Sequence, residues 1–550
     1  MIETVTYTGL LNLTSPASNR VFQRDIRIGN PVGNWTASYG KGWGTVTFGI
    51  NPSTGAALIE YRVRDAENAA QRPLLDWASC GTNIPAGSNT LAVVLPARAG
   101  WSFVDIRANG DDSSIVTTNL VGVGEVIAAT GQSLATDFWT TLATGDTATL
   151  SNCGVAPSPY GVCLAAWDGA PAPSPGTPWR VPSNTSEYRS TFCGEFTRLA
   201  VTGCGVNCGL VGYAWSGEPI ASWAADDSGP KNVWALLTST LDAGVGQGGK
   251  IGTFIWAQGH NDARYPQIGI DGDELTSDRY VHTLGQVLDA LAARYSGFTF
   301  ARILSSIPAI GANWITAVPK FSPFFIEQIR AAHLRYSRSD PLVLGHVDGL
   351  DVALWSDQTH PSQTGNVTYA RHFYRALMRV PGFGLNSSGD CGPTLAGTAI
   401  RPHGGRQIGL RITQNGGTTL TCSGGAAGAA TQFQVFKSGS TAIADQYLIA
   451  SADLSDPNVI VLGLMATPAD TQALDVWYRL PPDNDLALLP SNQIYDDNIL
   501  ESGLDGLTIG RQLAMVATPI TVPAPSWHEL VLVRPGASMF IANASIAYAL

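Results

Sequence analysis

The stretch that most constrains this chain is an apolar run, VGVGEVIAATG, that ends abruptly in Gln-Ser. Val123, Val126 and Ile127 suit an interior strand of a parallel sheet, and Gly131 lets the backbone turn sharply at its end. Ser133 would then stand at the tip of the strand, where α/β sheets hold their ligands and reactive groups. Two interpretations stay open, because a serine placed there is either a nucleophile or the cap of the next helix.

Hydrophobic periodicity divides the chain into three regions. Its 550 residues would fill about three domains at roughly 150 residues each. Short strands of alternating polarity predict an N-terminal β-sandwich over residues 1–120. Over residues 121–385, apolar strands alternate with helical stretches, which predicts an α/β domain with a parallel sheet. A second β domain is predicted over residues 391–550, with carbohydrate binding and partner docking as alternative roles.

Local sequence patterns predict individual strands, helices and turns within these regions. Val46, Phe48 and Ile50 alternate with small residues and should face a core. Residues 277–295 carry apolar side chains at helical spacing and predict a helix with one buried face. HELVLVRP, residues 528–535, predicts a strand, and the small-residue run SGGAAGAA is interpreted as a turn or linker.

Composition limits the partners of the chain. The net charge is −11, and no basic run is present that could track phosphates, so nucleic acid is not an expected partner. No stretch of eighteen apolar residues and no secretory leader is seen, so we expect no membrane partner. Low charge, at 14%, with many aromatic residues fits an extracellular protein that faces carbohydrate. An extracellular or virion-associated location reconciles these observations, and a cytoplasmic one stays open.

The cysteines leave several possibilities. Three pairs are close enough in sequence to form disulfides: Cys153 with Cys163, Cys204 with Cys208, and Cys391 with Cys422. The Cys-x-x-x-Cys at 204 to 208 has the form of half a metal site. No second Cys or His pair follows at ligand spacing, so we expect neither a metal nor another cofactor.

A serine nucleophile needs a base, and the base needs a group that orients it. The segment SDQTHPSQTG places Asp357 three residues before His360, on a loop that leads into a predicted helix from about Gln363. There the carboxylate can hold one ring nitrogen while the other faces a serine. Taken alone, the motif favours an exposed loop histidine until a serine partner is supplied.

Acyl transfer also needs hydrogen-bond donors directed at the oxygen that gains charge. Gly217 follows a short apolar run, and its backbone N–H could approach such an oxygen closely. Asn261 follows the apolar strand TFIWAQ, and its side-chain amide could also donate. Each has an alternative interpretation as an ordinary turn or cap residue.

The four residues together, in this order and each beside a strand end or the last helix, resemble the SGNH (GDSL-like) hydrolases. More narrowly, four segments resemble the sialate O-acetylesterase-like branch of carbohydrate esterases: GQS at 131, SGEPIASW at 216, WAQGHND at 256 and DQTH at 357. Leu134 stands where that branch has Asn, and His260 where it has Glu. The second departure restores the Gly-x-Asn-Asp form of the wider superfamily.

The resemblance implies a flavodoxin-like, three-layer α/β/α catalytic domain and assigns roles to its residues. It implies that Ser133 is the nucleophile, His360 the general base and Asp357 the residue that orients the base. The oxyanion hole would consist of the backbone N–H groups of Ser133 and Gly217 with the Asn261 amide. It also suggests Gln132 and His260 as substrate contacts, with a helix-capping role as the alternative for His260. Asp262 is expected to hold the loop beside Asn261.

We therefore predict a carboxylic ester hydrolase that removes O-acetyl groups from a polysaccharide or glycan. Assembly into a virion or a homo-oligomer is part of the same hypothesis. The alternative is a catalytically silent glycan-binding, adhesin or phage-tail protein that retains the fold. Trp101, Trp256, Trp314 and Trp355 are either sugar-stacking residues or core residues.

Overall fold

The computed structural model of the chain describes residues 11–525, apart from a set of gaps. The gaps are 14, 17, 32, 34, 38–39, 69–72, 142–145, 226–230, 248, 265–276, 296–300, 306–322, 348–351, 358, 381–392, 415–417, 423, 441, 479–493 and 497–519.

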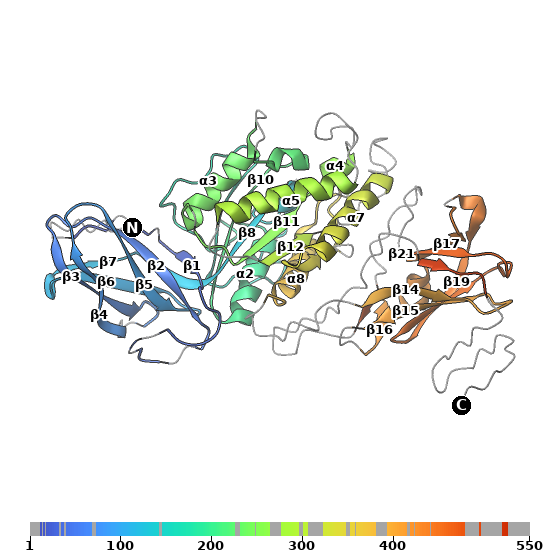
Figure 1. Cartoon of the computed structure of the whole chain (residues 1–550), viewed down its shortest axis with the longest axis horizontal. Helices are drawn as coiled ribbons and strands as arrows, with labels where there is room; N and C mark the ends of the chain where they lie inside the picture. Colours follow the sequence, from blue (N-terminus) through green and yellow to red (C-terminus); the bar gives the residue numbers. More distant parts are fainter. Residues whose placement is uncertain are drawn as a thin grey trace.

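A parallel sheet with helices on both sides forms the centre of the structure (Figure 1). Its strands lie in the order β13-β12-β11-β8-β10-β9. In chain order the strands are β8 (Val121–Gly131), β9 (Gly161–Trp167), β10 (Asn207–Ala214), β11 (Thr253–Ala257), β12 (Ala301–Ser305) and β13 (Val343–Val347). The helices are α1 (Ser133–Thr136), α2 (Thr191–Cys204), the 3₁₀ turn η1 (Ile220–Trp223), α3 (Val233–Val245), α4 (His260–Arg264), α5 (Ser277–Arg294), α7 (Pro323–Ser339) and α8 (Gln363–Leu377).

Strand β8 is buried along its whole length because helices cover both faces of the sheet. Val123 and Ile127 point into a core shared with α2 and α8, whereas Val126 and Ala128 point into a core shared with α3, α5 and α7. Successive side chains alternate between the faces of a strand, so a strand covered on both sides reads as one continuous apolar run. The predicted strand is confirmed, and so is the helix over 277–295, whose apolar face is buried in α5.

The N-terminal strands continue into the central sheet. They are β1 (Arg20–Gln23), β2 (Trp43–Ile50), β3 (Ala56–Asp65), β4 (Pro73–Ile84), β5 (Asn89–Pro96), β6 (Ser102–Ala108) and β7 (Asp111–Thr117). Strand β2 pairs with β5, and β3 pairs with β4 and β6, all antiparallel. Val46, Phe48 and Ile50 are buried, as predicted. Strand β1 instead lies parallel to the first half of β8, so residues before 120 also contribute to the α/β sheet.

A buried charge cluster joins β1 to β8. Glu125 of β8 is 1% exposed and pairs with Arg24 at 2.5 Å and with Arg27 at 2.9 Å. Gln23 donates to the same carboxylate at 3.1 Å. Burial opposes ionisation of Glu125, but the charges of the two arginines outweigh it and lower the pKa of this carboxyl. The glutamate is therefore ionised and holds the N-terminal segment against the central strand.

The C-terminal strands form two four-stranded antiparallel sheets around a core of their own. The elements are β14 (Thr394–Ile400), β15 (Gln407–Thr413), β16 (Leu420–Cys422), α9 (Gly425–Ala430), β17 (Phe433–Lys437), the 3₁₀ turn η4 (Ile443–Asp445), β18 (Gln446–Tyr447), β19 (Ile449–Asp456), β20 (Val459–Leu464), β21 (Leu474–Tyr478), β22 (Ile494–Asp496) and β23 (Ile520–Val522). The prediction of a turn or linker in SGGAAGAA is wrong, because its alanines favour the short helix α9. HELVLVRP and the boundary between 385 and 391 lie outside the described residues.

Two of the suggested disulfides do not form. Cys153, Cys163, Cys204 and Cys208 are all unpaired. Cys163 lies in the interior of β9, and its thiol hydrogen-bonds with that of Cys193 in the core; burial raises the pKa of Cys163 well above its usual value. Cys391 lies outside the described residues, so its pairing with Cys422 stays a prediction.

Neither a membrane-spanning helix nor a metal-binding cluster of side chains occurs within the described ranges. No helix there is both long and apolar enough to cross a membrane. No group of three or more His, Cys, Asp or Glu side chains in those ranges is placed to hold a metal ion.

The Glu125 cluster can be tested by a change that removes charge but keeps shape. We expect Glu125→Gln to lower the free energy of unfolding by about 3–5 kcal/mol, because it leaves the buried Arg24 and the partly buried Arg27 without their anion. Glu187→Gln breaks an exposed pair with Arg180 at 3.6 Å and should cost less than about 1 kcal/mol. Urea unfolding of both variants measures the difference, and equal losses would contradict the role given to Glu125.

Candidate active site

Ser133 lies at the carboxyl end of β8, as the sequence predicts, and is the first residue of α1. The turn before it depends on Gly131, whose φ is +146°. A Cβ atom at this position would lie 2.0 Å from the carbonyl oxygen of Ala257 on the neighbouring strand β11. Ser133 is 7% exposed, and within the described ranges its hydroxyl makes no hydrogen bond, so the side chain does not cap the helix.

The predicted pair of Asp357 and His360 forms in the structure. The Asp357 carboxylate lies 2.7 Å from Nδ1 of His360, and its other oxygen accepts from the backbone N–H groups of Thr359 and His360. Burial alone would raise the pKa of Asp357, but these hydrogen bonds lower it to about 2. The carboxylate is therefore ionised at neutral pH and orients the imidazole with Nδ1 as donor.

The position of His360 is fixed by the start of α8. Ser362 caps this helix by accepting from the N–H of Gly365 at 3.0 Å. The side-chain oxygen of Gln363 accepts from the N–H of Thr191, at the start of α2, at 2.8 Å. Because α2 and α8 pack together, the loop that carries the histidine is attached to the same framework as the sheet.

Several acidic side chains act on His360 from other elements. Burial disfavours the protonated ring, but the hydrogen bond with Asp357 and the negative charges of Asp137 and Asp168 outweigh it. The pKa of His360 is raised as a result. Asp137 follows α1, and Asp168 follows β9, so carboxylates at the ends of two other elements act on His360. No hydrogen bond joins Ser133 to His360 in the described ranges, and that contact stays a prediction.

The loop with Gly217 follows β10 and is held by Asp168. Asp168 accepts from the backbone N–H of Ser216 at 2.6 Å and from its hydroxyl at 3.2 Å. The Ser216 hydroxyl also lies 3.4 Å from that of Thr136 in α1. Gly217 has φ +76°, a conformation that favours glycine. The loop of the predicted oxyanion donor is thus fixed beside the helix that begins with Ser133.

Gln132 connects Ser133 to the second predicted donor. Its side-chain oxygen accepts from the backbone N–H groups of Gly259 at 3.2 Å and Asn261 at 3.0 Å. The Gln132 side chain is 2% exposed, and its described hydrogen bonds are with other residues of the protein. The side-chain amide of Asn261 makes no hydrogen bond within the described ranges and is partly exposed, so it is available to donate. Substrate contact by Gln132 stays a prediction.

Asp262 holds the same loops together through hydrogen bonds. It accepts from the N–H of Ile220 at 3.0 Å and from the side chain of Gln258, and it therefore ties the segment after Gly217 to α4. Burial raises its pKa to about 7, although these hydrogen bonds act in the opposite direction. Tyr280 continues the network by donating to Gln258 at 2.6 Å.

His260 is the first residue of α4 and is 3% exposed. Among the described residues neither ring nitrogen has a hydrogen-bond partner, so the side chain does not cap the helix. Burial, with the positive charges of His360 and Arg330, lowers its pKa to about 3. The ring is therefore neutral and near His360, and its contact with substrate stays a prediction.

Two of the four tryptophans are core residues, and the sugar-stacking role stays a prediction for the other two. Trp101 and Trp256 are buried core residues, and Trp256 packs edge-on against Trp223. Trp355 is partly exposed next to the His360 loop, and its N–H donates to the His360 carbonyl at 2.8 Å. Trp314 lies outside the described residues.

Sequence reasoning did not find Asp137, Asp168 or Trp215. Trp215 follows β10 directly, is partly exposed, and donates its N–H to the Gly131 carbonyl at 3.1 Å. Asp168 and Trp215 each follow the end of a strand, and Asp137 lies four residues after Ser133, so position at a strand end was the available signal. Nothing in the residue types indicated which of the many polar residues in such loops would face the histidine.

No protein-family model and no curated protein matches the sequence. Among solved structures, a carbohydrate acetylesterase from Xanthomonas citri is similar over 88% of this chain and 100% of its own, with a TM-score of 0.55 and 16% identity. A carbohydrate acetylesterase family member from Sinorhizobium meliloti covers 48% of this chain and 100% of its own, with a TM-score of 0.30 and 16% identity. An acetylxylan esterase from Geobacillus stearothermophilus covers 48% of this chain and 97% of its own, with a TM-score of 0.26 and 16% identity.

The first of these similarities extends over nearly the whole chain and concerns the fold. The predicted fold class is confirmed: an SGNH-type α/β sheet with helices on both faces, accompanied by additional antiparallel β sheets. This chain therefore shares its overall fold with the carbohydrate acetylesterase from Xanthomonas citri.

Proposed function

We propose that the chain is a serine esterase that removes O-acetyl groups from a glycan. The observation that carries this proposal is the Asp357–His360 pair, joined at 2.7 Å on the loop before α8. It belongs to the same domain as Ser133, which lies at the end of the central strand. The proposed triad supplies a nucleophile, a base and an anchored carboxylate, the set that acyl transfer requires.

In the proposed reaction, Oγ of Ser133 attacks the acetyl carbonyl carbon while Nε2 of His360 accepts the hydroxyl proton. The backbone N–H groups of Ser133 and Gly217 and the Asn261 amide stabilise the oxyanion. His360 then gives its proton to the leaving sugar oxygen, which leaves an acetyl ester on Ser133. A water molecule, deprotonated by His360, attacks this ester and releases acetate.

The surroundings support a sugar as the leaving group. Trp215 and Trp355 are partly exposed next to the Gly217 loop and the His360 loop, respectively. Aromatic faces with a polar edge suit the apolar face and hydroxyl groups of a pyranose ring. An extracellular or virion-associated location remains a prediction from the sequence.

The proposed nucleophile is tested by Ser133→Ala. We expect hydrolysis of 4-nitrophenyl acetate to fall by a factor on the order of 10³ or more, with loss of fluorophosphonate labelling, because no other group replaces the serine. Ser113→Ala alters an exposed serine of β7 and should retain both signals. If the native chain shows neither hydrolysis nor labelling, the proposal fails and the glycan-binding alternative is preferred.

The electrostatic role of Asp168 is tested by the pH dependence of kcat/KM. Asp168→Asn keeps an oxygen for the Ser216 N–H but removes a negative charge that favours the protonated His360. The pKa of His360 should therefore fall, and the acid limb of the profile should move to lower pH. The shift should shrink at high salt, because the charge is exposed.

Asp112→Asn is the matched control, since it removes the same charge from an exposed carboxylate of β7 that pairs with Arg107. Its acid limb should coincide with that of the native chain. An unmoved acid limb in Asp168→Asn, or a shift to higher pH, would contradict the charge effect of Asp168.

A further inference from the structure

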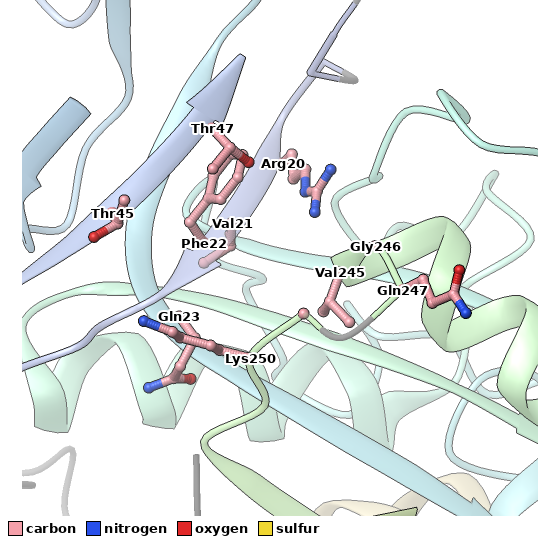
Figure 2. Close-up of a pocket in the computed structure, with 11 residues that line it drawn as sticks. Arg20, Val21, Phe22, Gln23, Thr45, Thr47, Val245, Gly246, Gln247 and Lys250 are labelled. Atoms are coloured by element: carbon pink, nitrogen blue, oxygen red, sulfur yellow. The ribbon is translucent and has the colours of Figure 1, made fainter. Parts of the chain in front are cut away.

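A cavity lies at the opposite end of the central sheet from Ser133 (Figure 2). It has a volume of about 470 Å³ and is lined by β1, β2 and the loop that follows α3. Strand β1 pairs with residues 121–124 of β8, at its start, whereas Ser133 follows the end of that strand. At roughly 3.3 Å per residue, the two sites are separated by on the order of 30 Å along β8. This cavity is therefore distinct from the proposed esterase site.

Arg20 dominates the chemistry of this cavity. Within the described ranges it makes no hydrogen bond or ion pair, and its Nε is buried without a partner. Its guanidinium lies 4.5 Å from the centre of the Phe22 ring, over the face of the aromatic group. Burial lowers its pKa to about 10, so the side chain still carries its charge at neutral pH.

The Asp25 carboxylate near this cavity already has hydrogen-bond and ion-pair partners. Asp25 forms an ion pair with Lys250 and accepts from the N–H and the hydroxyl of Thr45 at 2.8 and 2.6 Å. Lys250 and Asp25 therefore cancel, and the charge of Arg20 remains. The cavity thus has a net positive charge in a chain whose net charge is −11.

The C-terminus of α3 stabilises the positive charge of Arg20 but, within the described ranges, accepts no hydrogen bond from it. A Cβ atom at Gly246 would lie 3.6 Å from Nη2 of Arg20, so the guanidinium lies beside the C-terminus of this helix. The helix dipole favours a cation there. No carbonyl of that end accepts from Arg20 in the described ranges, so its N–H groups remain available to a ligand.

We propose that this cavity binds the carboxylate of an acidic sugar residue. Arginine presents a planar fork of N–H donors that matches the two oxygens of a carboxylate. Thr47 and Gln247 are exposed polar side chains on opposite walls and suit the hydroxyl groups of a sugar ring (Figure 2). The volume is within the range of sites for small ligands, about 300–1,000 Å³. The choice of a saccharide rests on the proposed esterase function, whereas the carboxylate follows from Arg20.

Calorimetric titration of the full chain at low salt tests the proposal. The ligands are glucuronate, galacturonate and N-acetylneuraminate, with glucose and galactose as neutral controls. We expect at least one acid to bind and neither neutral sugar to do so. In Arg20→Met the affinity should fall by about tenfold or more, since a charge-assisted pair is lost.

Arg406→Met is the matched control, because it removes the same charge from an exposed arginine of the C-terminal region, next to Thr467. It should bind the acid as the native chain does. Arg20→Lys keeps the charge without the fork and should bind more weakly than native but more tightly than Arg20→Met.

The proposal is overturned if none of the three acids binds, if a neutral sugar binds equally well, or if Arg406→Met loses as much affinity as Arg20→Met. No ester is present in the titration, so its result is independent of the esterase test. A failure here leaves the proposed reaction at Ser133 standing, and a silent Ser133 leaves this site standing.

Discussion

The close approach of two strand ends, β8 and β11, determines how the candidate site is built. Gly131 and Ala257 are register partners, and a Cβ on Gly131 would lie 2.0 Å from the Ala257 carbonyl oxygen. With no side chain there, the N–H of Gln132 can donate to that carbonyl at 3.2 Å. Gln132 then accepts from the N–H groups of Gly259 and Asn261. The loop that carries Ser133 and the loop that carries Asn261 are therefore a single hydrogen-bonded unit.

His360 is positioned by a different set of contacts. His360 does not follow a strand end; it lies on a loop fixed through Gln363 to the start of α2. Its surroundings are acidic, since Asp137, Asp168 and Asp357 all favour the protonated ring. An imidazole in such surroundings is a stronger base, but it is deprotonated only at higher pH. This arrangement favours proton abstraction from a hydroxyl at neutral to alkaline pH over activity in acid.

Local signals explain what the sequence could predict. The strand before Ser133 was recognisable because burial on both faces leaves a continuous apolar run, and α5 because its apolar residues recur at helical spacing. Asp357 and His360 were recognisable because they lie only three positions apart in the sequence. Asp168 was not, because its partner Ser216 lies 48 residues away and an Asp-Gly after a strand is common in turns. The pairing of β1 with β8 likewise depends on a contact between residues about a hundred positions apart.

Charge is unevenly distributed between the two ends of the central sheet. Three carboxylates act on His360 at the carboxyl end, whereas Arg20 leaves a positive charge at the amino end. An acidic polymer would be repelled by the first end and attracted by the second. On the proposed functions, a neutral acetylated stretch would enter the esterase site while a carboxylate elsewhere on the same chain is held by Arg20. Since the sites are on the order of 30 Å apart along β8, only a polymer could contact both at once. Linking two weak contacts in this way raises the local concentration of the ester without tight binding at the reacting group.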